Sequence, residues 1–213
     1  MGNWLDTTFY IFDKAILNFY HNLAVSCGGF LTPVMRFISL LGTHGIFMIV
    51  LGVILWFFSK TRKIATSALI SMLIGFLITN LILKNAVARL RPYTHVEFAQ
   101  WWQLVGAPVE KDLSFPSGHV TVVASFITGA FAVSKNKKYT FLLFLCVIVM
   151  GVSRNYLMVH YPSDVLGGVL SGVVSGIIGG LITKLIYNKF INEKQTKFAN
   201  FYKSFSLLKK KSK

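Results

Sequence analysis

Two long apolar runs limit what this chain can fold into. Residues 64–83 contain no charged side chain, and residues 165–186 contain a single lysine near the end of the run. About 20 apolar residues are enough for a helix to cross the ~30 Å hydrocarbon core of a membrane. In a chain of 213 residues, two such runs predict an integral membrane protein.

Three further apolar stretches add to these two. Residues 38–58 form one, and two shorter runs cover 120–133 and 139–152. Each short run adjoins a polar motif, so we expect the motifs to extend the helices and to lie recessed at one membrane face. The predicted fold class is all-α, a polytopic membrane helix bundle of about five transmembrane helices (six in the alternative below) plus an N-terminal amphipathic helix.

The composition agrees with this prediction. Hydrophobic residues make up 54% of the chain and charged residues 14%, whereas soluble domains carry about 25% charge; intrinsic disorder is excluded. A net charge of +15 is also found in nucleic-acid-binding proteins, but those expose their basic residues, and here charge-free runs separate them. We therefore expect no nucleic-acid partner. Cys27 and Cys146 provide neither a metal site nor a disulfide framework.

The placement of lysine and arginine predicts the orientation. Fifteen of the 22 basic residues fall in one set of connections: Lys60, Arg62, Lys63, Lys135, Lys137, Lys138 and nine lysines from Lys184 to Lys213. The positive-inside rule makes this set cytoplasmic. The polar motifs then face outward, which predicts a multi-pass protein of the plasma membrane with its site outside and its C-terminal tail in the cytoplasm. The net charge is mainly a signal of topology.

Both ends of the chain carry amphipathic patterns. We expect residues 1–37 to be an N-terminal interfacial segment, residues 38–187 the transmembrane core and residues 188–213 a basic cytoplasmic tail. The first segment lacks the features of a cleaved signal peptide, and its apolar residues recur at helical spacing; the alternative is a sixth span through 15–36. The tail has an aromatic stripe among lysines, which indicates a helix on the inner leaflet or, alternatively, a solvated tail. The stripe consists of Phe198, Phe201, Tyr202, Phe205 and Leu208.

Glycines recur every four residues in the last apolar run, at Gly168, Gly172, Gly176 and Gly180. Small residues at this spacing let helices approach closely. We favour packing within one bundle; the alternative is a homodimer through this helix.

The first polar motif follows the second apolar run. Arg91 and Pro92 come seven and eight residues after Lys84, so both cations project from one face if the helix continues that far, with Pro92 marking its end. Arg89 lies on a different helical face and is predicted to contact solvent or lipid headgroups.

The second motif, Pro116-Ser117-Gly118-His119, opens a helix. Unpaired N–H groups and the helix dipole at such an end suit a phosphate. Ser117 is alternatively only the helix N-cap. Both interpretations place His119 at an anion-binding end.

The third motif contains Ser153-Arg154, His160 and Asp164. Pro162 suits a first helical turn, from which Asp164 can reach back to the His160 imidazole. A carboxylate on one ring nitrogen fixes the tautomer and leaves the other nitrogen as base or nucleophile. The helix dipole alone also favours an aspartate there.

Together these residues match the requirements of phosphoryl transfer: fixed cations, N–H donors, a nucleophile and an acid. The residues alone leave open which histidine is the nucleophile. A metal-dependent site would need clustered carboxylates, and only Glu110 and Asp112 lie close together in the outer segments, so we expect no metal and no cofactor. His21, His44 and His95 have no comparable partners and are predicted to be interfacial or structural.

The three motifs resemble the signatures of the type-2 phosphatidic acid phosphatase superfamily, which also includes the vanadium-dependent haloperoxidases. Every motif position is matched in order. The resemblance implies that His160 attacks phosphorus to give a phosphohistidine, that Asp164 orients it, and that His119 protonates the leaving group and then activates water. It also implies a set of groups that hold the phosphoryl oxygens: Lys84, Arg91, Ser117, Gly118, Ser153 and Arg154.

A membrane lipid phosphatase at the outer face is the function that this resemblance implies, with a lipid phosphate as substrate and membrane lipids as surroundings. Its short bacterial members are often undecaprenyl diphosphate or phosphatidylglycerophosphate phosphatases; we favour the diphosphate, with phosphatidate as a further alternative. Trp101 and Trp102, in the 93–115 loop, either flank the access route or anchor the loop. An anion-binding transporter is the alternative from another class, but the chain shows no inverted repeat. A haloperoxidase is disfavoured because those relatives are soluble.

Overall fold

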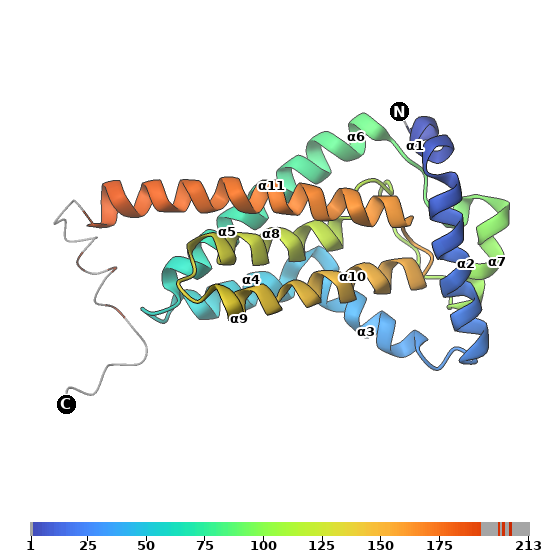
Figure 1. Ribbon diagram of the computed structural model, residues 1–213, viewed down its shortest axis with the longest axis horizontal. Helices are drawn as coiled ribbons and strands as arrows, with labels where there is room; N and C mark the ends of the chain where they lie inside the picture. Colours follow the sequence, from blue (N-terminus) through green and yellow to red (C-terminus); the bar gives the residue numbers. More distant parts are fainter. Residues whose placement is uncertain (1, 193–199, 201, 203–204, 206–213) are drawn as a thin grey trace.

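The structure is a computed structural model that describes residues 2–192, 200, 202 and 205. Within these residues the chain is helical, without strands. Five passes run side by side along the long axis of the molecule (Figure 1). They are α3 (Thr32–Gly42) with α4 (Ile46–Trp56), α5 (Arg62–Phe76) with the π-helical η2 (Leu77–Leu83) and α6 (Lys84–Val87), α8 (Gly118–Val133), α9 (Lys137–Leu142) with α10 (Phe144–Tyr156), and α11 (Pro162–Ile186).

Three of these passes are long and apolar enough to cross a membrane, and the other two are shorter apolar helices. Large apolar side chains such as Leu81, Ile148 and Leu170 are exposed on the outside of the bundle, where a soluble protein would carry polar residues. The predicted polytopic all-α membrane bundle is confirmed.

The short helix α8 forms the centre of the bundle. It packs against both α5 and α11, which also contact each other. Every residue of α8 from Val120 to Ala130 is buried. A helix surrounded by protein needs no continuous contact with lipid, which explains why its apolar run is shorter than a full membrane crossing.

The glycine stripe of α11 lies against α8. A Cβ atom added at Gly172 would lie 2.4 Å from the Cβ of Ala124 and 2.9 Å from the backbone nitrogen of Ser125. At Gly176, the added atom would lie 2.3 Å from the Cβ of Thr128. The stripe therefore packs within one chain, as favoured above, and a homodimer through this helix stays a prediction.

Replacing Gly172 with valine should destabilise the bundle by about 1–3 kcal/mol, because the nearest atoms are the Cβ of Ala124 and backbone atoms of α8, none of which can rotate away. Thermal unfolding in detergent measures the effect. Leu170→Val is the matched control, since it introduces the same side chain on the exposed face of α11. Equal melting temperatures for the two variants would contradict this account of the stripe.

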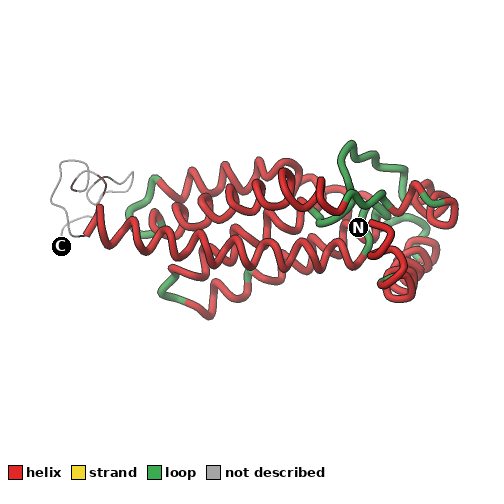
Figure 2. The backbone as a smooth tube through the Cα atoms, turned by 90° about the horizontal axis from the view of Figure 1, so that it is seen from above, coloured by secondary structure: helices red, strands yellow, loops and turns green. Residues whose placement is uncertain are grey.

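The N-terminal helices α1 (Gly2–Thr8) and α2 (Tyr10–Ser26) lie across one end of the bundle (Figures 1 and 2). The chain turns over residues 27–31 before α3 begins, so a continuous sixth span through 15–36 is not formed. Helix α2 exposes Ile11 and Phe19 on one side, and on the other it buries Asp13 and Leu17. It is amphipathic as predicted, but its buried face carries a carboxylate.

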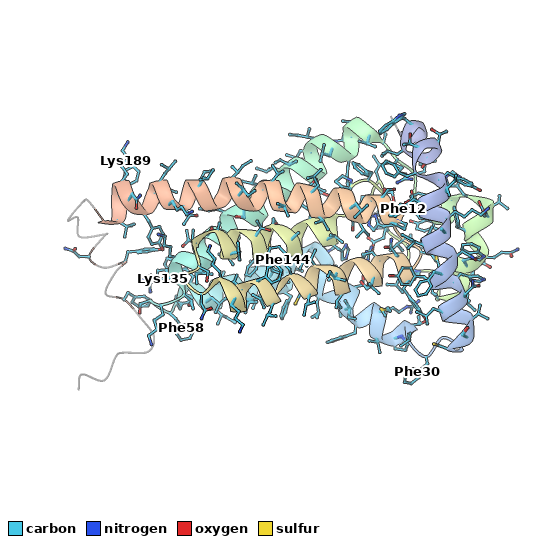
Figure 3. All side chains as sticks on the ribbon, in the orientation of Figure 1. Phe12, Phe30, Phe58, Lys135, Phe144 and Lys189 are labelled. Atoms are coloured by element: carbon cyan, nitrogen blue, oxygen red, sulfur yellow. The ribbon has the colours of Figure 1, made fainter. Side chains whose placement is uncertain are left out.

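Basic residues mark the opposite end of the bundle. Lys135 and Lys189 lie there, whereas Phe12 and Phe30 lie at the end covered by α2 (Figure 3). The aromatic stripe predicted in the tail falls on residues outside the described part of the chain, except Tyr202 and Phe205.

Candidate active site

A cavity of about 540 Å³ lies at the end of the bundle where α8 and α11 begin. Its walls also include Phe76 and Asn80 from the second pass and residues 109–112 of the following loop. Several predicted site residues line it: Lys84, Arg91, Gly118, His119 and His160. The structure therefore brings members of all three motifs to one pocket.

His160 lies in the connection from α10 to α11, and its side chain is 1% exposed. Its Nε2 atom is 3.1 Å from Nη1 of Arg91. Its Nδ1 atom is 3.6 Å from Oδ2 of Asp164 and 3.5 Å from Oγ of Ser114. The two ring nitrogens thus face different partners: Nε2 the cation, and Nδ1 the carboxylate.

Asp164 is fully buried in the first turn of α11. Its Oδ2 atom accepts hydrogen bonds from the backbone N–H of Tyr161 at 2.9 Å and from the hydroxyl of Ser114 at 2.5 Å. The aspartate therefore caps its helix and faces His160 at the same time. The two roles that the sequence suggested for it, residue of a helix start and partner of the imidazole, thus occur together. Ser114 was not among the predicted site residues.

The cations of the site are paired with carboxylates of one loop. Lys84 and Arg91 both form ion pairs with Asp112, and Arg154 forms one with Glu110. Burial alone would raise the pKa of Asp112, but these two partners outweigh it and hold that pKa below its usual value. The loop thus shows that anionic oxygens can be held at these cations.

Lys84 and Arg91 do not meet on one helical face, contrary to the prediction. The helix ends at Val87, and Ala88 adopts a left-handed conformation with φ of 53°. The chain then runs extended through Arg91. Both side chains still reach Asp112, because the turn redirects the chain toward the 109–112 loop.

At the start of α8, Ser117 occupies the N-cap position without a capping bond from its side chain. Within the described residues its buried hydroxyl has no hydrogen-bond partner. Its backbone N–H donates to the carbonyl of Asp164 at 3.0 Å, which joins the starts of α8 and α11. His119, in the first turn of α8, has Nε2 3.5 Å from the hydroxyl of Thr43.

Some predicted residues lie behind the cavity wall. The guanidinium of Arg154 is buried and donates to Ser39 and Glu110, and its Nε atom has no partner within the described residues. The hydroxyl of Ser153 donates to the carbonyl of Met150 at 2.8 Å. Arg154 therefore reaches the cavity through Glu110, and the Ser153 hydroxyl is bonded within its own helix and is not part of the cavity wall.

The prediction for Arg89 was wrong. Its side chain is 1% exposed and lies among acidic residues instead of facing solvent or headgroups. The helical wheel fails here because the left-handed residue Ala88 ends the helix one position earlier. The sequence did contain one sign that Arg89 could be buried in an ion pair: Asp13 lies in a segment of mostly apolar residues.

The remaining histidines differ in their surroundings. His44 lines the cavity because the first pass breaks there, with φ of 51°, and a broken helix at membrane depth is tolerated where it lines a cavity. His21 stacks on Trp101 with ring centroids 4.6 Å apart. Trp102 stacks on Tyr93 and donates to the carbonyl of Pro108 at 2.9 Å, so these tryptophans anchor the loop.

Residues 2–192, 200, 202 and 205 contain no cluster of three or more histidine, cysteine or acidic residues suited to a metal ion. That the protein needs no metal or cofactor stays a prediction.

The sequence profile of the PAP2 superfamily matches residues 64–190. An undecaprenyl-diphosphatase of Sulfolobus acidocaldarius is 31% identical over 140 residues, which cover 65% of this chain and 64% of the relative. Phosphatidylglycerophosphatase B of Bacillus subtilis is 32% identical over 151 residues, covering 65% of this chain and 68% of the relative. A lipid A 4'-phosphatase of Porphyromonas gingivalis is 29% identical over 53% of this chain and 50% of its own length. The chain thus spans from half to about two thirds of these relatives.

Two solved structures share the fold. Aquifex aeolicus LpxE has a TM-score of 0.54 and 22% identity, covering 70% of this chain and 84% of its own. A transmembrane PAP2 type phosphatidylglycerolphosphate phosphatase from Bacillus subtilis has a TM-score of 0.54 and 23% identity, covering 88% of this chain and 98% of its own.

Proposed function

Since this chain belongs to the PAP2 superfamily, we propose that it is a membrane lipid phosphatase that hydrolyses a lipid phosphate or diphosphate through a phosphohistidine intermediate. The observation that carries the proposal is the position of His160. Its Nε2 atom lies beside the cation Arg91, and both residues line the cavity, while Nδ1 faces the buried carboxylate of Asp164.

In the proposed first step, His160 Nε2 attacks phosphorus and forms an N–P bond as the bond from phosphorus to the leaving oxygen breaks. Asp164 favours the tautomer with the proton on Nδ1 and stabilises the positive charge that develops on the ring. The 3.6 Å separation is of the kind that shortens when substrate binds. His119 donates a proton to the leaving oxygen.

In the second step, His119 takes a proton from water, the water oxygen attacks phosphorus, and the N–P bond breaks to release inorganic phosphate. Lys84, Arg91 and Gly118 hold the phosphoryl oxygens from the cavity wall. Arg154, Ser117 and Ser153 lie behind that wall and join them when their side chains turn toward the bound substrate. The current partners of the cations, Asp112 and Glu110, are carboxylates, whose contacts the substrate oxygens take over. Fixed positive groups around the transferring phosphorus stabilise the charge of the transition state.

A lipid substrate is supported by the way the cavity meets the outside of the bundle. Phe76 lines the cavity and is also 50% exposed on the membrane-spanning second pass. A headgroup can therefore occupy the cavity while its hydrocarbon chain stays among lipids. The basic residues at the other end, including Lys135 and Lys189, support an outward-facing site and a cytoplasmic tail (Figure 3).

Undecaprenyl diphosphate, converted to undecaprenyl phosphate, is the substrate we favour, supported by the 31% identity to an undecaprenyl-diphosphatase. Phosphatidylglycerophosphate is the second candidate. It is supported by the 32% identity to phosphatidylglycerophosphatase B and by the shared fold of the solved phosphatidylglycerolphosphate phosphatase.

Phosphate release by purified protein tests the proposal. The protein, in detergent with EDTA, is given undecaprenyl diphosphate, phosphatidylglycerophosphate or phosphatidate, and kcat/KM is compared. We expect release to continue with EDTA present and to be fastest with the diphosphate. Release from none of the three would overturn the phosphatase proposal, and faster release from phosphatidylglycerophosphate would replace the favoured substrate. Anion uptake into vesicles without release from any lipid would favour a transporter.

The pH dependence follows from His160. Burial, together with the positive charges of Arg91 and Arg154, holds the pKa of His160 well below its ordinary value. The neutral imidazole is the nucleophile, so a lowered pKa keeps it reactive as the pH falls. The acid limb of kcat/KM that belongs to His160 should therefore lie below about pH 6.5, the ordinary histidine pKa. The measurement of kcat/KM is repeated with two substrates whose phosphate groups ionise at different pH values. A limb that stays at the same pH with both substrates belongs to the enzyme and not to the substrate. Such a limb at or above pH 6.5 would contradict the assignment.

A further inference from the structure

A buried cluster of charged residues joins α2 to the start of α11. Arg89 donates from Nη1 to Oδ1 of Asp164 and to Oγ of Ser163, both at 2.7 Å. Its Nη2 atom donates to Oδ2 of Asp13 at 2.8 Å, and Nε donates to Oδ1 of Asp6 at 2.8 Å. The guanidinium thus makes a bond from each of its nitrogens. The cluster does not form part of the wall of the 540 Å³ cavity, although Arg89 borders a neighbouring pocket of about 480 Å³ that shares Lys84 and Arg91 with it.

Asp13 connects this cluster to the helix that carries Asp164. The carboxylate of Asp13 is 2% exposed, and its Oδ1 atom accepts the backbone N–H of Ser163 at 2.8 Å. Its Oδ2 atom accepts the hydroxyl of Ser163 at 2.6 Å. An N–H in the first turn of a helix has no partner within the helix, so Asp13 acts as a cap supplied by another helix.

Charge balance explains why the cluster matters for Asp164. Among the residues that the structure describes, Arg89 is the cation within bonding distance of both Asp13 and Asp164, which are almost completely buried. A buried carboxylate without a cation takes up a proton or turns toward other donors, because burial penalises its charge. Either change would remove the negative charge that faces Nδ1 of His160.

We propose that Arg89 and Asp13 are positioning residues for the reaction. Arg89 keeps Asp164 ionised and directed toward Nδ1 of His160, and Asp13 fixes both Arg89 and the first turn of α11. The proposal rests on the proposed phosphatase function. It assigns the N-terminal helix α2 a part in holding the nucleophile, although α2 supplies no residue to the cavity wall.

Arg89→Gln and Asp13→Asn test the proposal in full-length protein. Since neither side chain lines the cavity that contains His160, kcat should fall by about 10- to 100-fold, the range for groups that orient a reacting side chain from behind, while KM stays within about twofold. Lys14→Ala is the matched control, because it removes a charge from the next residue of α2, which is paired with Glu97 on the surface. We expect wild-type kcat for this control.

A double variant shows whether the two residues act together. If Asp13 acts through Arg89, Arg89→Gln combined with Asp13→Asn should lose little more kcat than Arg89→Gln alone. Rates are normalised to the fraction of folded protein, measured by circular dichroism and size-exclusion chromatography in detergent, so partial unfolding does not imitate a catalytic loss. Arg89→Lys should recover part of kcat by restoring the charge. If the Arg89→Gln variant does not fold, the kcat values of Asp13→Asn and Arg89→Lys test the proposal instead.

Wild-type kcat in folded Asp13→Asn and Arg89→Gln would overturn the proposal, as would a rise in KM without a fall in kcat. Strictly additive losses would show that Asp13 does not act through Arg89. Absence of phosphate release from the wild-type protein would instead overturn the proposed function, so the two failures are distinct.

Discussion

His160→Ala protein should release phosphate at least about 10³-fold more slowly than wild type, because removing a nucleophile leaves only binding and charge stabilisation. In the proposed mechanism the imidazole also provides the atom at which the phosphoryl group is held between the two steps. The variant should therefore form no acid-labile phosphoprotein when it is mixed with labelled substrate and quenched.

His95→Ala is the control, since His95 is exposed and lies outside the cavity wall. It should match wild type in both rate and labelling. Retained labelling in His160→Ala would assign the covalent intermediate to another residue, with His119 the first to test by the same experiment.

Replacing Arg91 with alanine should lower kcat/KM by about 10²- to 10³-fold, the loss typical of one group that stabilises transition-state charge. Arg91 has two roles in the structure. It lies 3.1 Å from Nε2 of His160, the proposed nucleophile, and its Nη1 atom also donates to the carbonyl of Val159 at 2.7 Å. Its loss removes a charge and loosens the connection that carries the nucleophile.

Arg91→Lys separates these roles. Lysine keeps the charge but cannot reproduce the planar fork, so we expect it to recover only part of the rate. Lys60→Ala removes one cation from the other end of the bundle and should leave kcat/KM unchanged. Full activity in Arg91→Lys would show that charge alone matters here, and full activity in Arg91→Ala would remove Arg91 from the site.

The sequence predicted the helical bundle and the three motifs because both are local patterns. A run of apolar residues indicates a span, and motifs at helix ends meet when the helices pack with the same ends together. His119, His160 and Asp164 were predicted in this way, and His160 and Asp164, only four residues apart, lie in the structure with Nδ1 3.6 Å from Oδ2.

The contacts that the sequence did not predict join distant segments. Ser114 lies 50 residues from Asp164, and Asp13 lies 150 residues from Ser163. No spacing rule connects such pairs. Arg89 was misplaced for a different reason: a single left-handed residue, Ala88, ends the helix on which its direction was predicted. The break at His44 was not predicted either, although Gly42 and Gly45 lie on either side of it in an otherwise apolar run.

Helices α8 and α11 both begin at the cavity, so they run parallel and their positive dipole ends lie together. Parallel dipoles repel each other, and the repulsion grows as the helices approach. At Gly168 an added Cβ would lie 2.8 Å from the carbonyl oxygen of Ser117, so the glycines set how close the two ends come. The small residues therefore affect the electrostatic potential at the cavity as well as the distance between the two helices. A side chain that separates the helices should weaken anion binding even where the bundle stays folded.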